Sequence, residues 1–211
     1  MKNNHLFEPV LQQVEKYYSN KIGLHGATPQ GADWNSIESQ ELRFAQLAHI
    51  FIDEESFSIN DFGCGYGALL GYLRERYSSF QYNGFDISES MVTTARKLYA
   101  GTESCTWTTE LSGLPVADYT VASGIFNVKL ETDEATWKAY ILSTLDQLNA
   151  KSLKGFSFNI LTLYSDIEKR RPNLYYADPL VLFDHCKRKY SRFVALLHDY
   201  PLYEFTILVR K

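Results

Sequence analysis

Apolar residues recur at helical spacing in three long stretches of the chain. The stretches are residues 6–19, 34–52 and 132–148. The third is the most regular, and Asp133 and Glu134 stand in its first turn, where negative charge is favourable next to the helix N-terminus. A period of 3.6 residues predicts that each stretch is an amphipathic helix with one buried face.

Short runs with β character lie between the helical stretches. They are Phe57–Phe62, Phe80–Asp86, Cys105–Thr108, Tyr119–Ser123, Gly155–Leu161, Phe193–Leu197 and Tyr203–Val209. The first five alternate with segments of helix length, and residues 67–77, 88–99 and 132–148 fill three of the gaps. Alternating strands and helices predict a parallel sheet with helices on both faces.

The last two runs depart from this alternation. Only residues 198–202 separate them, whereas a crossover between parallel strands needs about ten to twelve residues at least. If these two strands pair, they must therefore be antiparallel. A sheet that is parallel except for its last strand differs from the ordinary dinucleotide-binding architecture.

The run Asp61–Gly67 follows the first predicted strand and contains three alternating glycines. Glycines allow a sharp turn and a close approach of backbone to ligand, and the helix that follows offers free N–H groups. Asp86 ends the second predicted strand, where a carboxylate can accept both hydroxyls of a ribose. The glycines alone also fit a nicotinamide dinucleotide, but together with Asp86 they predict a nucleoside-cofactor site.

Composition indicates one globular domain over residues 1–211, because no repeat or linker divides the chain. No apolar run has the roughly 18–20 residues of a membrane helix, and the N-terminus lacks the apolar core of a signal peptide. Three scattered cysteines give neither a disulfide framework nor a metal-binding pair. We therefore expect a cytoplasmic protein without a metal, and a monomer or homodimer.

The net charge of −4 disfavours a nucleic-acid partner, since binding to phosphates requires positive charge. Two basic triplets, Lys169–Arg171 and Lys187–Lys189, nevertheless stand in the last quarter of the chain. Each triplet has two interpretations. It is either solvated helix end and loop, or a patch for an anionic substrate or a nucleic acid.

The motifs resemble those of the class I (Rossmann-like) S-adenosylmethionine (SAM)-dependent methyltransferases. Asp61–Gly67 looks like the first motif of that family, and Phe85–Ser88 looks like its second-strand motif. Glu110–Pro115, followed by Asp118, is similar to the third motif, although the family usually has Asp where this chain has Glu110. Motifs cover about residues 55–160, and strand order extends the resemblance to residue 211.

The resemblance implies a seven-stranded sheet in the order 3-2-1-4-5-7-6 that binds SAM and releases S-adenosylhomocysteine. Residues 1–55 would form a helical cap on a core of residues 56–211, with a further cap insertion at about 162–180. By this resemblance, the cofactor-binding residues are Asp61, Gly63, Cys64, Gly65, Tyr66, Gly67, Asp86, Ile87, Glu110, Leu111 and Gly124. Asp61 would contact the ammonium group, Asp86 the ribose and Glu110 the adenine.

The acceptor of the methyl group is less defined. Trp34, Asn127 and Tyr164 are candidates for contact with it, since aromatic rings in the cap segments can stack on a planar molecule and Asn127 follows the fourth strand. The Asn/Asp-Pro-Pro-aromatic motif of enzymes that methylate base amines or amides is absent here. Lys129 is either an anion contact or a solvated lysine.

A positioned base is needed if the acceptor loses a proton. His25, His185 and His198 are candidates, and the sequence favours none of them. We expect a small-molecule acceptor. The alternatives are an RNA or protein methyltransferase, a non-catalytic SAM-binding module of the same fold, and an NAD(P)-linked oxidoreductase.

Overall fold

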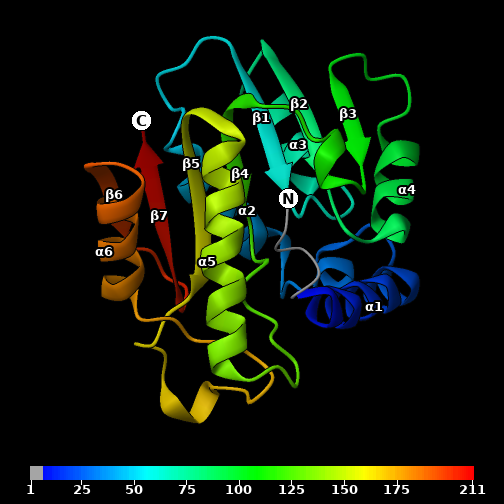
Figure 1. Cartoon of the computed structure of the whole chain (residues 1–211). Coiled ribbons are helices and arrows are strands. Elements are labelled where there is room, and N and C mark those ends of the chain that lie inside the picture. The colour runs from blue at the N-terminus through cyan, green and yellow to red at the C-terminus, as the bar shows by residue number, and fades with distance from the viewer. Residues whose placement is uncertain (1–6) are drawn as a thin grey trace.

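A computed structural model describes residues 7–211. Seven strands form one sheet in the order β3-β2-β1-β4-β5-β7-β6, with helices on both faces (Figure 1). Neighbouring strands are parallel except for the antiparallel pairs β5–β7 and β6–β7. The strands are β1 (Phe57–Phe62), β2 (Phe80–Phe85), β3 (Cys105–Thr108), β4 (Ala117–Ala122), β5 (Ser152–Leu161), β6 (Phe193–Leu197) and β7 (Glu204–Arg210). The predicted fold class and strand order are confirmed.

Six α-helices accompany the sheet within the described residues. They are α1 (Glu8–His25), α2 (Ile37–Ala48), α3 (Ala68–Arg74), α4 (Glu89–Leu98), α5 (Glu134–Ala150) and α6 (Pro179–Lys189). Three short 3-10 helices are η2 (Pro29–Ala32), η3 (Leu111–Gly113) and η4 (Ile167–Lys169). None of these helices has both the length and the apolar character that a membrane crossing requires.

Two hydrophobic cores lie on opposite faces of the sheet. In Figure 1, α5 and α6 lie in front of the sheet and α2 and α3 lie behind it. The front core contains Trp137 and Leu182, and the rear core contains Phe44 and Leu70. Because both faces are covered, β7 is buried from Phe205 to Val209, which explains its nearly continuous apolar sequence.

Side chains at the helix starts explain where α4 and α5 begin. Ser88 Oγ accepts a hydrogen bond from the Met91 N–H at 3.2 Å, and Asp133 Oδ1 accepts one from the Thr136 N–H at 2.9 Å. Each bond satisfies a backbone donor that has no partner within its own helix. Ser88 is therefore the N-cap of α4.

The helices differ from the sequence prediction most in two places, and the ends of the other predicted helices shift by one to four residues. α1 continues to His25, well past the predicted end at residue 19, because Ile22 extends the buried stripe. α6 was missed altogether. It buries Leu182 and Cys186 along with Pro179, a stripe too short to stand out in the sequence. Leu6, the first apolar residue of the predicted N-terminal helix, lies outside the described residues.

Two segments lie beyond the carboxyl ends of the parallel strands. Figure 1 shows α1 below α4 at this edge, and residues 162–178 at the lower end of α5. Ser19 Oγ and Ser88 Oγ are 2.7 Å apart and join α1 to the start of α4. The bridge from Val128 to Leu174 joins the second segment to the β4–α5 loop, and its Ala177 N–H donates to the Leu161 carbonyl oxygen at the end of β5, at 2.9 Å. Both segments therefore surround the edge where the glycine run ends.

Candidate functional site

The glycine run turns sharply between β1 and α3. The N–H groups of Gly63 and Cys64 both donate to the Phe85 carbonyl oxygen, at 2.7 and 3.0 Å. This contact fixes the loop against the end of β2. Gly63, Gly65 and Gly67 all have positive φ, at 85°, 54° and 85°, a region that other residues rarely adopt.

The three glycines have different surroundings. A Cβ atom on Gly67 would lie 2.5 Å from the Trp107 ring, and one on Gly63 would lie 2.2 Å from the Ile125 side chain. A Cβ atom on Gly65 would meet nothing closer than Met91 Sδ at 3.9 Å. Gly67 is therefore required for packing of α3 against the sheet, whereas Gly65 borders open space.

That open space is a cavity of about 820 Å³, a volume that includes the solvent at its mouth. Predicted cofactor residues that line it are Asp61, Gly63, Cys64, Gly65, Tyr66, Asp86, Ile87 and Gly124. Lining residues that the sequence did not single out include Val14, Gln40, Phe44, Met91 and Tyr140. We call it the acidic cavity, for the charges described next.

Backbone N–H groups hold the Asp86 side chain next to the glycine loop. Its Oδ2 accepts from the Gly65 N–H and its Oδ1 from the Ser88 N–H, each at 2.9 Å. Burial raises the pKa of Asp86 to about 6, and these two hydrogen bonds oppose the rise. Each carboxylate oxygen keeps a second lone pair, so a pair of ligand hydroxyls can still donate to Asp86.

Asp61 lies deeper, at the end of β1. Its Oδ2 accepts from the Tyr82 hydroxyl at 2.5 Å, and its side chain is 2% exposed. Burial raises the pKa of Asp61 to about 7; the Tyr82 hydrogen bond lowers it and the nearby Asp86 charge adds to the rise. No described residue neutralises Asp61 with a positive charge.

The charged residues that line the acidic cavity favour some ligands over others. Asp61 and Asp86 are the charged residues among those that line the acidic cavity, and no Lys, Arg or His is in that set. A pyrophosphate would bring negative charge next to two carboxylates, which is unfavourable. A ligand with positive charge would lower the pKa of both carboxyls and gain binding energy. The cavity therefore suits a cation such as the ammonium and sulfonium groups of SAM.

Two buried polar atoms at the ends of β4 and β5 lack hydrogen-bond partners among the described residues. They are Ser123 Oγ and Asn159 Nδ2. Asn159 Oδ1 accepts from the Gly124 N–H at 2.7 Å, so its amide group is oriented by Gly124. Ser123 lines the acidic cavity, and an unpartnered buried hydroxyl there is a natural contact for a polar ligand.

A second cavity, which we call the polar cavity, adjoins the first. Tyr18, Ala32, Trp34 and Gly124 line both cavities. The other walls of the polar cavity include Asn127, Ser165, Lys169, Arg171, Asn173, Tyr176 and Glu204. The two cavities thus meet at the end of β4.

Trp34 forms the partition at this meeting point. A Cβ atom on Gly124 would lie 2.3 Å from Trp34 Cη2, so the ring lies directly against the Gly124 backbone. The Arg43 guanidinium lies over the same ring, with Cζ 4.2 Å from the ring centroid. Arg43 is in turn paired with the buried carboxylate of Glu204, with Nη2 to Oε1 at 2.7 Å. The sequence indicated neither Arg43 nor Glu204, because 161 positions separate them.

Asn127, predicted from its place after the fourth strand as a contact of the acceptor, lines the polar cavity. Its Oδ1 accepts from the Leu161 N–H at 3.0 Å, and its Nδ2 has no hydrogen-bond partner among the described residues. Lys129 lines neither cavity. Its Nζ donates to the carbonyl oxygens of Leu130 and Thr132, at 3.4 and 3.3 Å, which supports the loop before α5.

Several predicted residues lie outside both cavities. Gly67 packs on Trp107 instead. Glu110 is exposed and Leu111 packs on the front core, so adenine contact by this turn stays a prediction. Tyr164 is 69% exposed, and its ring lies 5.9 Å from that of His198. This placement gives no support to its predicted contact with the acceptor.

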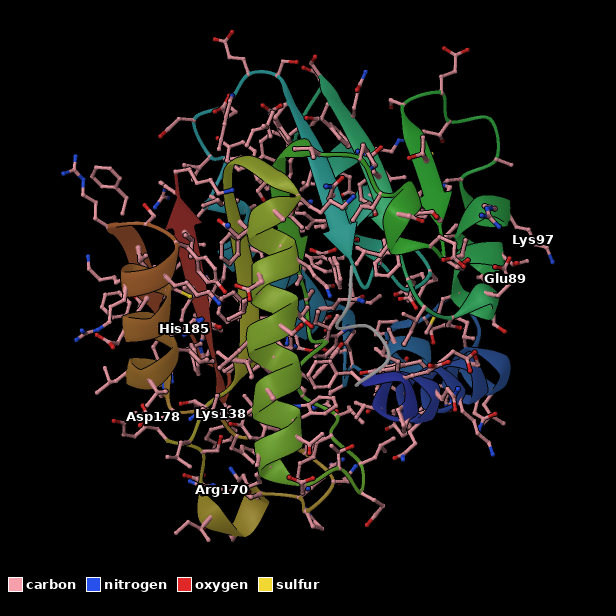
Figure 2. The ribbon with its side chains drawn as sticks, in the orientation of Figure 1. Glu89, Lys97, Lys138, Arg170, Asp178 and His185 are labelled. Atoms are coloured by element: carbon pink, nitrogen blue, oxygen red, sulfur yellow. The ribbon has the colours of Figure 1, made fainter. Side chains whose placement is uncertain are left out.

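The three histidines considered as bases also lie outside both cavities. Figure 2 shows His185 on α6, on the opposite side of the view from Glu89 and Lys97 of α4. His185 Nε2 is 3.4 Å from the Tyr190 hydroxyl. His25 ends α1 and His198 follows β6, and both are exposed. The site therefore has no histidine among its lining residues.

Comparison with known proteins gives a family. A family model described as "Methyltransferase domain" matches residues 59–145. A Mycobacterium tuberculosis protein, named "Putative methyltransferase Rv1506c", is 57% identical over 157 residues, which cover 74% of this chain and 95% of that protein. The match spans nearly the whole length of the relative.

Solved structures share the fold at low sequence identity. Magnesium protoporphyrin IX methyltransferase from Synechocystis PCC 6803 with bound SAM aligns with a TM-score of 0.63 and 15% identity, over 95% of this chain and 96% of that chain. Human N-acetylserotonin methyltransferase in complex with SAM aligns with a TM-score of 0.66 and 16% identity, over 97% of this chain and 59% of that chain. The chain belongs to the class I SAM-dependent methyltransferases.

Proposed function

We propose that the acidic cavity binds SAM and that the polar cavity beside it holds a small-molecule acceptor. The observation that carries this proposal is the shared wall. Gly124 and Trp34 border both cavities, so a donor in one and an acceptor in the other would meet at the end of β4. Methyl transfer requires such contact, because the methyl group passes directly between the two molecules.

The residues of the acidic cavity fit the parts of SAM. Asp86 would accept the two ribose hydroxyls, with Ile87 beside the adenine. Asp61 would face the ammonium group, and the unpartnered hydroxyl of Ser123 would hydrogen-bond to the amino-acid part. The open space next to Gly65 would admit the cofactor against the loop.

SAM supplies an electrophilic methyl group whose bonding electrons return to sulfur on transfer, leaving S-adenosylhomocysteine. The chain contributes alignment of the acceptor and exclusion of water, which are large effects for a two-molecule displacement. Trp34 and Tyr18 would exclude water from the junction. Their aromatic faces also suit the positive charge at sulfur.

A small molecule is favoured over RNA or protein by the form of the acceptor site. Segments from six parts of the chain surround the polar cavity: α1, residues 32–35, Arg43 of α2, the β4–α5 loop, residues 161–176 and residues 203–204. A polymer needs an open groove, and a polyanion also needs more positive charge than this chain of net charge −4 provides.

Calorimetric titration with SAM, S-adenosylhomocysteine and NAD tests the assignment of the acidic cavity. We expect saturable binding of both sulfur nucleosides and none of NAD. The matched variant Ser123→Ala removes only the unpartnered hydroxyl and should weaken SAM about three- to tenfold, the effect of one hydrogen bond. Binding of NAD, or undiminished binding of SAM to both Ser123→Ala and Asp86→Ala, would contradict the assignment.

Incubation with methyl-labelled SAM tests the acceptor class. Three pools should be compared under the same conditions: small metabolites, total RNA and total protein. We expect label in the small-molecule pool, and a lower rate with Trp34→Ala than with wild type. Label confined to RNA or protein would favour the alternative acceptor, and SAM binding without transfer to any pool would favour a non-catalytic module.

A further inference from the structure

Most charged groups around the polar cavity are already neutralised. Arg43 is paired with Glu204. The Asp33 carboxylate accepts from the Tyr17 hydroxyl at 2.7 Å and lies 2.7 Å from Lys21 Nζ. These pairs leave the basic triplet at residues 169–171 to set the net charge of the cavity.

The three members of that triplet have different partners. Lys169 Nζ lies 3.2 Å from Asp166 Oδ2 and donates to the Tyr203 hydroxyl at 2.9 Å. The Arg170 guanidinium folds back onto backbone carbonyls, with Nη2 3.1 Å from the Ser165 oxygen. Figure 2 labels Arg170 at the lower end of the segment that carries the triplet. Both cations are therefore used to hold this segment in place.

Arg171 is the exception. It lines the polar cavity and is also exposed to solvent. Its guanidinium has no carboxylate or hydrogen-bond partner among the described residues. Its backbone N–H donates to the Tyr176 hydroxyl at 2.9 Å, which fixes that ring beside it and leaves the Tyr176 proton free to donate. The unpartnered Nδ2 of Asn127 lines the same cavity. The cavity thus has one uncompensated positive charge and neutral donors.

We infer that the acceptor carries a carboxylate or phosphate group and that Arg171 binds this group. A guanidinium presents paired N–H donors that match the two oxygens of either anion. Held there, the acceptor would extend across the polar cavity toward Gly124, where the cavities meet. This inference rests on the proposed acceptor role of the polar cavity.

Binding of small anions to the protein saturated with S-adenosylhomocysteine tests the inference. The probes are phenyl phosphate, benzoate and the uncharged phenol, and calorimetry measures the affinity of the protein for each. We expect the two anions to bind more tightly than phenol, and Arg171→Gln to weaken them by about tenfold or more, as loss of a charged hydrogen-bonding partner implies. Arg171→Lys, which keeps charge but loses the paired donors, should be intermediate.

Arg188→Gln is the matched control, because Arg188 is exposed on α6, pairs with Asp184 at 2.7 Å and lines neither cavity. It should bind the probes as wild type does. Equal binding of phenyl phosphate to wild type and Arg171→Gln, or no preference for anions over phenol, would overturn the inference. S-adenosylhomocysteine binding is measured first in each sample, so its failure would count against the proposed cofactor site and not against the anion site.

Discussion

Asp61 illustrates how the site opposes the stability of the free protein. Its pKa in the folded protein is about 7, against about 3.9 in an unfolded chain. The folded state therefore holds the proton more tightly than the unfolded state between these values. Sites that retain a destabilising group are commonly functional. A bound cation would offset the cost of the buried Asp61 charge.

Asp61→Asn should accordingly stabilise the free protein at pH 8 but not at pH 4. The contribution of Asp61 to stability is full below about pH 4 and is lost as the pH rises through 7. Removing its charge should raise the free energy of unfolding at pH 8 by up to about 4 kcal/mol, since the pKa is raised by roughly three units at a cost of roughly 1.4 kcal/mol each. Urea unfolding at both pH values measures this difference. An equal effect at both would show that charge is not the cause.

The same raised pKa predicts that cofactor affinity depends on pH. Protonation of Asp61 below about pH 6 removes the negative charge that attracts an ammonium group. SAM should therefore bind more weakly at pH 5.5 than at pH 8, and the affinity of Asp61→Asn should be low and depend less on pH in that range, because only Asp86 of the two carboxyls still titrates there. Calorimetry at the two values checks both statements. A wild-type affinity that is constant with pH would argue that Asp61 does not contact the cation.

Asp86 provides the most direct test of the ribose contact. Asp86→Ala should lower SAM affinity by about 10- to 100-fold, because a hydrogen bond to a charged group contributes about 1.5–3 kcal/mol. Circular dichroism should confirm an unchanged fold. Asp184→Ala, at an exposed position on α6, is the control. Unchanged affinity in Asp86→Ala would exclude the proposed ribose contact.

At the scale of elements, the strand-to-helix turn combines two tasks. Gly67 allows α3 to pack against Trp107, and Gly65 keeps the cavity open. The two positions lie in one motif and both have positive φ, yet substitution should affect different properties. Substitution of Gly67 should lower the stability of the fold, and substitution of Gly65 should lower the affinity for the ligand.

Gly65→Ala should still fold, but it should bind SAM poorly, since the added methyl group would project into the acidic cavity. Gly101→Ala is a matched control, because Gly101 also has positive φ and open surroundings but lines neither cavity. Both should lose roughly 1 kcal/mol of stability from backbone strain. Only Gly65→Ala should lose affinity. A similar affinity in the two variants would mean that the cofactor does not approach Gly65.

Gly67→Ala should instead lose several kcal/mol of stability. Its Cβ would lie 2.5 Å from Trp107 and 2.8 Å from Tyr99, and overpacking of this kind adds about 1–3 kcal/mol to the backbone strain. Thermal unfolding measures the loss. A stability equal to that of Gly101→Ala would show that α3 can move away from Trp107 with no loss in the free energy of unfolding.

At the scale of the whole molecule, Arg43 and Glu204 connect the N-terminal segment to the last strand. Arg43 Nε donates to both carboxylate oxygens of Glu204, at 3.0 and 2.9 Å, and the Glu204 side chain is 1% exposed. The pair also supports Trp34 at the junction of the cavities. Long-range packing thus fixes the partition between the acidic and polar cavities.

Arg43→Leu should destabilise the protein by about 3–5 kcal/mol, because it leaves the buried Glu204 carboxylate without a counterion. The double variant Arg43→Leu, Glu204→Leu should recover much of that loss, since no buried charge remains. Urea unfolding of the wild type, both single variants and the double variant gives the coupling energy. Additive losses would mean that the two side chains do not interact.

Local features of the sequence determined the elements and the residue types of the candidate cofactor site. Hydrophobic periodicity gave the strands and most helices, and the short link before β7 required an antiparallel pair. The glycine run and Asp86 followed two neighbouring strands, whose carboxyl ends must meet at one edge of the sheet. Such features depend on residues close together in the chain, and a sequence displays them directly.

Only the tertiary structure decided which distant residues share a site. It brought Trp34 onto Gly124 and Arg43 to Glu204, and it left Tyr164 exposed although its residue type suited an acceptor contact. It also distinguished Arg171 from its two basic neighbours, which the sequence shows as equivalent. The physical reason is that a side chain's environment depends on burial and on partners from other elements, and spacing along one chain does not record them.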